Sequence, residues 1–203
     1  MKIICIGRNY AEHAKEMKAE TPTEPVFFMK PETAIVRNGD PFFYPKFSQE
    51  VHHEVEIILR VSRNGKNIQK KFAHKYFDEI TVGIDFTARD LQAECKAKGL
   101  PWEKAKAFDG SAPMGTFVPL TRFKNVNDIS FHLDINGKTV QQGSTKDLIF
   151  SFDTLIEYVS QFTTLKMGDF IYTGTPAGVG PVKIGDKMEA FIEKEKLFEC
   201  NVR

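Results

Sequence analysis

The chain has 203 residues, 41% of them hydrophobic and 18 of them phenylalanine, which is enough for a sizeable core. Its 28 basic and 27 acidic residues nearly cancel, and no basic run indicates a nucleic-acid partner. No apolar stretch reaches the length of a membrane helix, the opening apolar run is too short for a signal peptide, and three scattered cysteines fit neither a disulfide framework nor a zinc knuckle. We therefore expect a cytoplasmic protein with reduced thiols, built as one domain over residues 1–203, that binds neither nucleic acid nor membrane.

The first half of the chain predicts short strands with a single helix between the first two. Strands are expected over residues 2–7, 26–30 and 54–62, the last of them ending at the turn "RNGK". Residues 9–19 predict a short helix, with Asn9 as its N-cap.

The second half continues in the same style. An apolar strand runs up to Asp85, and the following helix is closed by Gly99. Residues 129–137 alternate and end at "NGK", which predicts a hairpin with 139–144. A helix over 151–162 with Ser151 as its cap precedes the strand of "DFIYTGTPAG" and two closing strands. This pattern favours a β-rich α+β fold with a rolled or barrel-like sheet over a doubly wound fold.

Paired carboxylates form the first candidate site. In "VHHEVEIILR", Glu54 and Glu56 are spaced to share one face of a strand, where burial would make their repulsion worse. Asp85, at the end of another apolar strand, completes a set of oxygen ligands suited to Mg²⁺, Mn²⁺ or Ca²⁺. Taken from spacing alone, Glu-x-Glu also fits a solvated strand edge. His52 and His53 face opposite ways, so both cannot join Glu54.

Five motifs in order carry a family resemblance: "GRNYAEHAKEM", "HHEVEI", "GIDFTARDLQ", "KAFDGSAPMG" and "TGTPAGVG". From residue 4 to about 191, the chain resembles the short members of the fumarylacetoacetate hydrolase superfamily. The resemblance implies a mixed β-roll, a homodimer, and Mg²⁺ or Mn²⁺ bound by Glu54, Glu56 and Asp85. That cation would relieve the repulsion. Without it, loss of the Asp85 carboxylate should remove a repelling charge and stabilise the fold.

The resemblance also assigns the catalytic roles. A lid segment near residues 9–22 carries His13 and Glu16, which lie on one helix face and are expected to activate water. Taken alone, such a pair also fits a surface contact. Lys106, before "AFD", is expected to stabilise enolate charge, whereas Lys104 is the solvated competitor.

Substrate contacts are expected from Arg89, Gln92 and Thr175. Arg89 could instead pair with Asp90 or Glu94 on its own helix. Two further residues, Tyr10 and Lys30, fit the site wall, with core packing and a surface charge as their respective alternatives. Val140 stands where many relatives have arginine before the glutamine that is Gln141 here, which bears on substrate identity.

The preferred hypothesis is hydrolysis of a carbon–carbon bond in an acylpyruvate, a small 2-oxo acid, to pyruvate and a carboxylic acid. Two alternatives use the same enolate: decarboxylation of oxaloacetate, and isomerisation of the type acting on 2-hydroxyhepta-2,4-diene-1,7-dioate. An alternative of another class is a catalytically silent metal- or ligand-binding protein.

Overall fold

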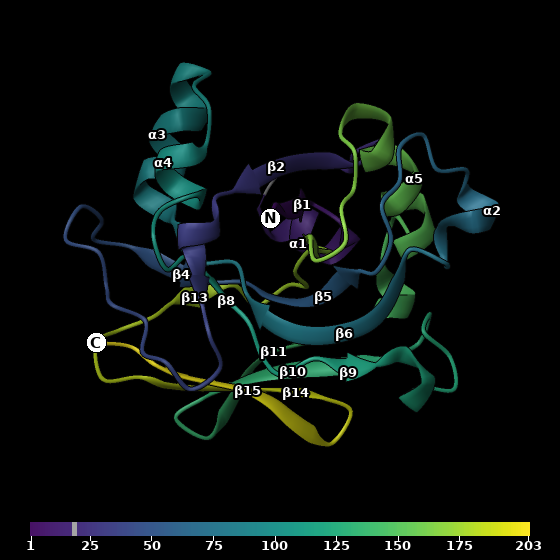
Figure 1. The fold of residues 1–203 in the computed structure, drawn as a ribbon. Helices are drawn as coiled ribbons and strands as arrows, with labels where there is room; N and C mark the ends of the chain where they lie inside the picture. Colours follow the sequence, from purple (N-terminus) through teal and green to yellow (C-terminus); the bar gives the residue numbers. More distant parts are fainter. Residues whose placement is uncertain (18–19) are drawn as a thin grey trace.

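The computed structural model describes residues 1–17 and 20–203, and strands dominate it (Figure 1). Two sheets contain most of them. The larger sheet has six strands in the order β2 (Val26–Lys30), β1 (Ile3–Gly7), β12 (Phe170–Tyr172), β5 (Val55–Val61), β6 (Phe77–Ile84) and β9 (Val118–Pro119). The other has four, in the order β11 (Lys138–Ser144), β10 (Ser130–Ile135), β14 (Lys187–Ile192) and β15 (Glu195–Asn201). Only the β1–β12 pair is parallel among the described strands of these two sheets.

Two smaller sheets complete the strands. One contains β13 (Gly180–Pro181), β4 (Val51–His53) and β7 (Thr87–Ala88), and the other pairs β3 (Ile35–Val36) with β8 (Ala112–Pro113). The helices are short: α1 (Ala11–Glu16), α2 (Lys70–Ala73), α3 (Arg89–Lys98), α4 (Glu103–Lys106) and α5 (Phe152–Phe162). The β-rich α+β class expected from the sequence is confirmed. None of the described helices combines the length and the apolar character needed to cross a membrane.

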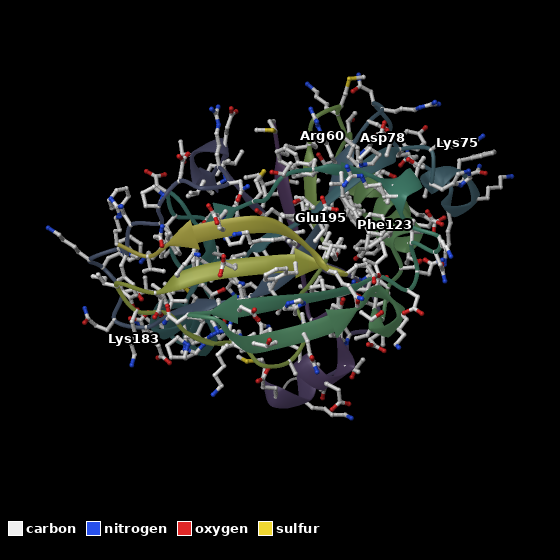
Figure 2. The ribbon with its side chains drawn as sticks, turned by 90° about the horizontal axis from the view of Figure 1, so that it is seen from below. Arg60, Lys75, Asp78, Phe123, Lys183 and Glu195 are labelled. Carbon is white, nitrogen blue, oxygen red and sulfur yellow. The ribbon has the colours of Figure 1, made fainter. Side chains whose placement is uncertain are left out.

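The layers place helices on two sides of the strands. In Figure 1, α3 and α4 lie together at one side of the six-stranded sheet, while α2 and α5 lie together at the other. The four-stranded sheet packs below the curved strands β5 and β6. Its outer face carries polar side chains such as Glu195 (Figure 2). The main core lies between the two sheets and against α5, because the inward residues of β10, β14 and β15 are apolar.

Local sequence signals explain several of these elements. Asn136 and Gly137 have φ of 53° and 76°, which is the left-handed pair that a two-residue hairpin requires. Ser151 accepts a hydrogen bond from the Thr154 amide and so caps α5, as predicted. Gly99 ends α3 with φ of 62°, also as predicted.

Asn9 does not cap the first helix. Its side chain is fully buried, donates to the carbonyls of Phe150 and Thr173 at 3.0 and 2.8 Å, and accepts from the Phe150 amide at 2.8 Å. The residue before α1 is Tyr10, which makes no capping bond through its side chain. Tertiary hydrogen bonds outweigh the local capping preference here. Asn9 thereby ties the start of α1 to the loop after β12. Residues 18 and 19 of the expected lid segment 9–22 lie outside the described residues.

The expected strand over residues 54–62 is interrupted at its start. β4 ends at His53 and pairs with β7 and β13, whereas β5 begins at Val55 and pairs with β6 and β12. Glu54 is therefore the residue at which the chain passes from one sheet to another.

We predict that Asn9→Ala lowers the free energy of unfolding by about 3 kcal/mol, because one buried and two partly buried polar groups lose their partner at once. Asn38→Ala is the matched control, since Asn38 is exposed and its bonds to Thr116 and Glu199 can be replaced by water. Urea unfolding of the metal-free protein measures both. Equal losses for the two variants would contradict the role assigned to Asn9.

Candidate active site

Three acidic side chains meet where β5 begins and β6 ends. Glu56 lies on β5, Glu54 directly before it, and Asp85 directly after β6. The antiparallel register places Val55 opposite Ile84, and the Asp85 amide donates to the Glu54 carbonyl at 2.8 Å. One carboxylate oxygen from each residue lies within 4.8 Å of those from the other two, and each residue is at most 5% exposed. The structure therefore brings together the trio that the sequence singled out.

Cations of the chain itself contact two of these carboxylates. The Lys106 ammonium bridges Glu54 Oε2 at 2.7 Å and Asp85 Oδ2 at 2.8 Å. Arg89 donates to Glu54 Oε1 at 2.6 Å, so it does not pair with Asp90 or Glu94. Lys30 lies 2.7 Å from Asp85 Oδ1. Because the two carboxylates and both lysines are buried and Arg89 is only partly exposed, the pairs are held in a medium that screens them poorly.

Glu56 is the member of the trio without such a contact among the described residues. It accepts one hydrogen bond, from the Gly174 amide at 2.7 Å. Burial, followed by repulsion from Asp85 and Glu54, raises the pKa of Glu56 well above its ordinary value. Burial also disfavours the charge on Glu54, but Lys106 and Arg89 outweigh it and hold the pKa of Glu54 well below its usual range. The pKa values of these two neighbouring carboxyls are thus shifted in opposite directions.

The residues present fit a divalent cation. Asp85 Oδ1 is fully buried and accepts no hydrogen bond from any described residue, although the Lys30 ammonium is near it. Glu56 has no cation of the described chain in contact with its carboxyl group. Oxygen-only donors of this kind suit Mg²⁺, Mn²⁺ or Ca²⁺ better than Zn²⁺. The roles of Glu54, Glu56 and Asp85 as ligands stay a prediction that this geometry permits.

A histidine–glutamate pair comes from helix α1. His13 Nδ1 lies 3.2 Å from Glu16 Oε2, and His13 is only 6% exposed. The Gly178 amide donates to both oxygens of Glu16, at 3.1 and 3.2 Å, so the carboxylate is fixed from the opposite side. In the tautomer whose Nδ1 proton is donated to Glu16, the imidazole has its lone pair on Nε2. This is the arrangement of an oriented base.

The loop after β12 contacts both Glu56 of the carboxylate trio and Glu16 of the histidine–glutamate pair. Gly174 has φ of 105°, and a Cβ there would lie 2.6 Å from the Asn9 Cβ, so only glycine fits. The next residue, Thr175, is buried, and its hydroxyl accepts from Gln141 Nε2 at 3.0 Å. Gln141 also donates to the Pro176 carbonyl, while its oxygen accepts from the Val55 amide. Gln141 thus positions the loop that presents Thr175.

One cavity collects most of the predicted residues. It is lined by His13, Glu54, Glu56, Asp85, Arg89, Gln92, Lys106 and Thr175. Glu16 does not line the cavity, but its carboxylate contacts His13 Nδ1. Lys104 is exposed and away from the cavity, whereas Lys106 is 3% exposed and lies 5.2 Å from the centre of the Phe28 ring.

Other residues at the site were missed or left undecided by the sequence reasoning. Lys30 is buried, not a surface charge, and its ammonium also donates to the carbonyls of Phe86 and Ser111. The position of this lysine at the end of the apolar strand "VFFMK" was the sequence signal that could have predicted its burial. Tyr10 packs edge-on against Phe131, and its buried hydroxyl has no hydrogen-bond partner among the described residues. Arg8 and Lys96 also line the cavity, and no local sequence pattern predicted this position for either residue.

The chain matches a known protein family along nearly its whole length. The family model described as "Fumarylacetoacetate (FAA) hydrolase C-terminal" matches residues 2–203. The mouse protein named mitochondrial oxaloacetate tautomerase FAHD1 is 44% identical over 191 residues, which are 94% of this chain and 86% of that protein.

Two solved structures from this group are similar along the whole chain. Fumarylpyruvate hydrolase from Pseudomonas aeruginosa, in complex with Mn²⁺ and pyruvate, has a TM-score of 0.93 and 35% identity, covering 100% of this chain and 89% of that one. The 2-hydroxyhepta-2,4-diene-1,7-dioate isomerase from Mycobacterium marinum has a TM-score of 0.86 and 33% identity, covering 99% and 73%.

The contacts of the trio reverse one expectation from the sequence. Because Asp85 has two lysines beside it, Asp85→Asn should lower the stability of the metal-free protein by about 3 kcal/mol, as it leaves buried ammonium groups underpaired. Glu56→Gln should leave that stability unchanged or raise it by about 1 kcal/mol, because the amide oxygen still accepts from Gly174 and a repelling charge is gone. Thermal unfolding in chelator compares the two variants; a larger loss for Glu56→Gln would refute this charge assignment.

Proposed function

Because this chain belongs to the fumarylacetoacetate (FAA) hydrolase C-terminal family, we propose that it is a divalent-metal-dependent enzyme that cleaves a carbon–carbon bond in acylpyruvates. The products would be pyruvate and a carboxylic acid. One observation carries the proposal: a buried carboxylate trio, an oriented histidine and a buried lysine converge on one cavity. The relative solved with Mn²⁺ and pyruvate supports a metal and a pyruvyl group as the ligands.

Glu54, Glu56 and Asp85 are the residues that would hold the cation, Mg²⁺ or Mn²⁺. When bound, such an ion supplies Lewis-acid polarisation of the 2-oxo acid and stabilises negative charge that develops on its oxygen. Gly174 fixes Glu56 and Lys30 lies against Asp85, so the backbone and a buried lysine orient two of the three carboxylates from outside the trio.

His13 has the position of the general base. Its Nε2 would take a proton from water, and the hydroxide would attack the distal carbonyl carbon of the acylpyruvate. The bond between that carbon and the methylene carbon of the pyruvyl group then breaks, with the electron pair passing into a pyruvate enolate. Return of the proton to the methylene carbon gives pyruvate beside the carboxylic acid. Glu16 stabilises the imidazolium that forms, because its carboxylate contacts the opposite ring nitrogen.

Lys106 offers positive charge to the enolate. Burial disfavours its charged form, but Asp85 and Glu54 outweigh burial and raise the pKa of Lys106 above its ordinary value, so the ammonium persists at neutral pH. Thr175 offers a hydroxyl at the cavity wall for the substrate carboxylate. Arg89 and Gln92 bond to each other at 2.7 Å, which supports a joint role for them at the same end of the substrate.

A second candidate function needs only proton transfer. The mouse relative carries the name oxaloacetate tautomerase, and His13 could move a proton between carbon and oxygen without delivering water. Decarboxylation of oxaloacetate and isomerisation of an unsaturated hydroxy diacid would use the same enolate stabilisation. A silent binding protein is disfavoured, because such a protein has no need for an oriented base. The homodimer, the cytoplasmic location and the lid function of residues 9–22 stay predictions.

Activity should disappear in chelator and return when Mg²⁺ or Mn²⁺ is added, since the donor set favours these ions. The purified protein is assayed with acetylpyruvate, fumarylpyruvate and oxaloacetate, and pyruvate release is separated from ketone–enol exchange. Pyruvate from the first two substrates is the expected outcome. Exchange of oxaloacetate without cleavage of either acylpyruvate would favour the tautomerase.

His13→Gln should reduce acylpyruvate cleavage by about 10²–10⁴-fold, because glutamine can occupy the space but cannot accept the proton. Calorimetric titration should find Mn²⁺ affinity within about threefold of wild type, since His13 is not among the proposed ligands. The control is Lys15→Gln on the same helix, where Lys15 is exposed and, within the described part of the chain, pairs with Glu12 alone. Full turnover by the His13 variant would exclude this base.

A further inference from the structure

Gln141 is a buried polar side chain that the proposed chemistry does not use. It lies on β11, an outer strand of the four-stranded sheet, and is 2% exposed. Its amide oxygen accepts from the Val55 amide at 3.0 Å and lies 2.8 Å from His53 Nδ1. Its amide nitrogen donates to the Thr175 hydroxyl at 3.0 Å and to the Pro176 carbonyl at 2.9 Å. All four hydrogen-bonding positions of this carboxamide are therefore occupied.

Two of these partners fix the orientation of the carboxamide. The Val55 backbone amide can only donate a hydrogen bond, and the Pro176 backbone carbonyl can only accept one. The Gln141 oxygen therefore faces Val55, and its nitrogen faces Pro176 and Thr175. His53 Nδ1 then carries a proton, because it faces the same oxygen. This second donor helps to hold the amide in place.

The orientation of Gln141 decides the direction of hydrogen bonding at Thr175. Because Gln141 donates, the Thr175 oxygen is the acceptor in their contact, and the hydroxyl proton of Thr175 points elsewhere. Within residues 1–17 and 20–203, no group accepts that proton. Thr175 is 3% exposed and lines the cavity that contains the carboxylate trio. Its proton is therefore available to an oxygen atom of a ligand in that cavity.

Close packing keeps Thr175 beside Gln141. The loop 174–178 lies against β11, where a Cβ added at Gly178 would lie 2.8 Å from the Val140 carbonyl oxygen. On the other side of Thr175, a Cβ added at Gly143 would lie 3.0 Å from the Pro176 side chain. Because these approaches leave little space between strand and loop, Thr175 cannot move far from the amide that orients it.

We propose that Gln141 is a positioning residue that makes Thr175 a hydrogen-bond donor to the carboxylate of the 2-oxo acid. A carboxylate only accepts hydrogen bonds, so a hydroxyl that presents its proton binds it and one that presents its lone pairs repels it. The inference rests on the proposed function for the presence of that carboxylate beside Thr175. Gln141 does not line the cavity and therefore acts through Thr175.

Reversing this hydrogen bond is the direct test. Gln141→Glu keeps an oxygen for Val55 and His53 but places a second oxygen at Thr175, which then donates its proton away from the cavity. The Mn²⁺-loaded protein is titrated with pyruvate, followed by the fluorescence of Trp102, which lines the same cavity. We expect pyruvate to bind about tenfold more weakly, as loss of one hydrogen bond to a charged group allows. Mn²⁺ affinity should stay within about threefold of wild type.

A double-mutant cycle separates this effect from direct repulsion by the introduced charge. Thr175→Val removes the hydroxyl and should itself weaken pyruvate binding about tenfold. In that background, Gln141→Glu should change the affinity less than about twofold, because the group through which it acts is absent. Gln142→Glu is the matched control, since Gln142 is the next residue on β11 and is exposed. Should Gln141→Glu not fold, the same cycle is measured with Gln141→Met, which removes the directing bond.

Turnover provides a readout that a general loss of structure would not reproduce. With acetylpyruvate, Gln141→Glu should raise KM about tenfold and change kcat less than about threefold, because the substrate carboxylate keeps its charge throughout the reaction. The same loop contacts Glu56 through Gly174 and Glu16 through Gly178. A variant that disordered this loop would therefore lower kcat and Mn²⁺ affinity as well.

The outcomes distinguish the positioning role from the proposed function. Unchanged pyruvate affinity in the Gln141 variant, or a loss that adds fully to that of Thr175→Val, overturns the positioning role. A loss that disappears in the Thr175→Val background, without cleavage of any acylpyruvate by the wild-type protein, supports the positioning role and overturns the proposed reaction. Absence of pyruvate binding to the Mn²⁺-loaded wild-type protein overturns both.

Discussion

The balance of buried charge at the ends of β5 and β6 governs the rest of this structure. Three carboxylates within 4.8 Å of one another cannot be buried without nearby positive charge. The chain supplies Lys106, Lys30 and Arg89 from three different elements, and each contacts Glu54 or Asp85. Glu56 remains the carboxyl that a bound dication would neutralise. The fold therefore leaves Glu56 without a cation in contact with it among the described residues, and that carboxyl is the basis of the proposed metal affinity.

The sheet topology explains how so many charged groups reach one place. Strands β5 and β6 bring Glu54 and Asp85 together through their register, and β12 places the Gly174 loop against Glu56. Helix α3 begins at Arg89 beside Glu54, and α4 ends at Lys106. Neighbouring elements of rigid secondary structure thus hold the charged groups, which limits the rearrangement needed when a ligand binds.

The segment carrying His13 depends on this framework through a few polar contacts. Asn9 ties the start of α1 to Phe150 and Thr173, and the Gly178 amide fixes Glu16 at its end. The same loop after β12 therefore serves the base and the carboxylate trio at once. Such sharing couples the position of the base to the position of the proposed metal ligands, which suits a reaction that needs both.

The sequence alone determined the fold class, the hairpin at Asn136–Gly137, the ends of α3 and α5, and the identity of the three carboxylates, because each depends on local periodicity, turn chemistry or a compact motif. Only the tertiary structure decided what surrounds those carboxylates. Lys30 and Asp85 are 55 positions apart, and nothing in "VFFMK" specifies that the lysine turns inward to meet an aspartate. The structure likewise shows that Asn9 is a buried tether between segments and not a helix cap. Charge pairing between distant segments depends on how the sheets pack, and local sequence patterns carry no record of that distance.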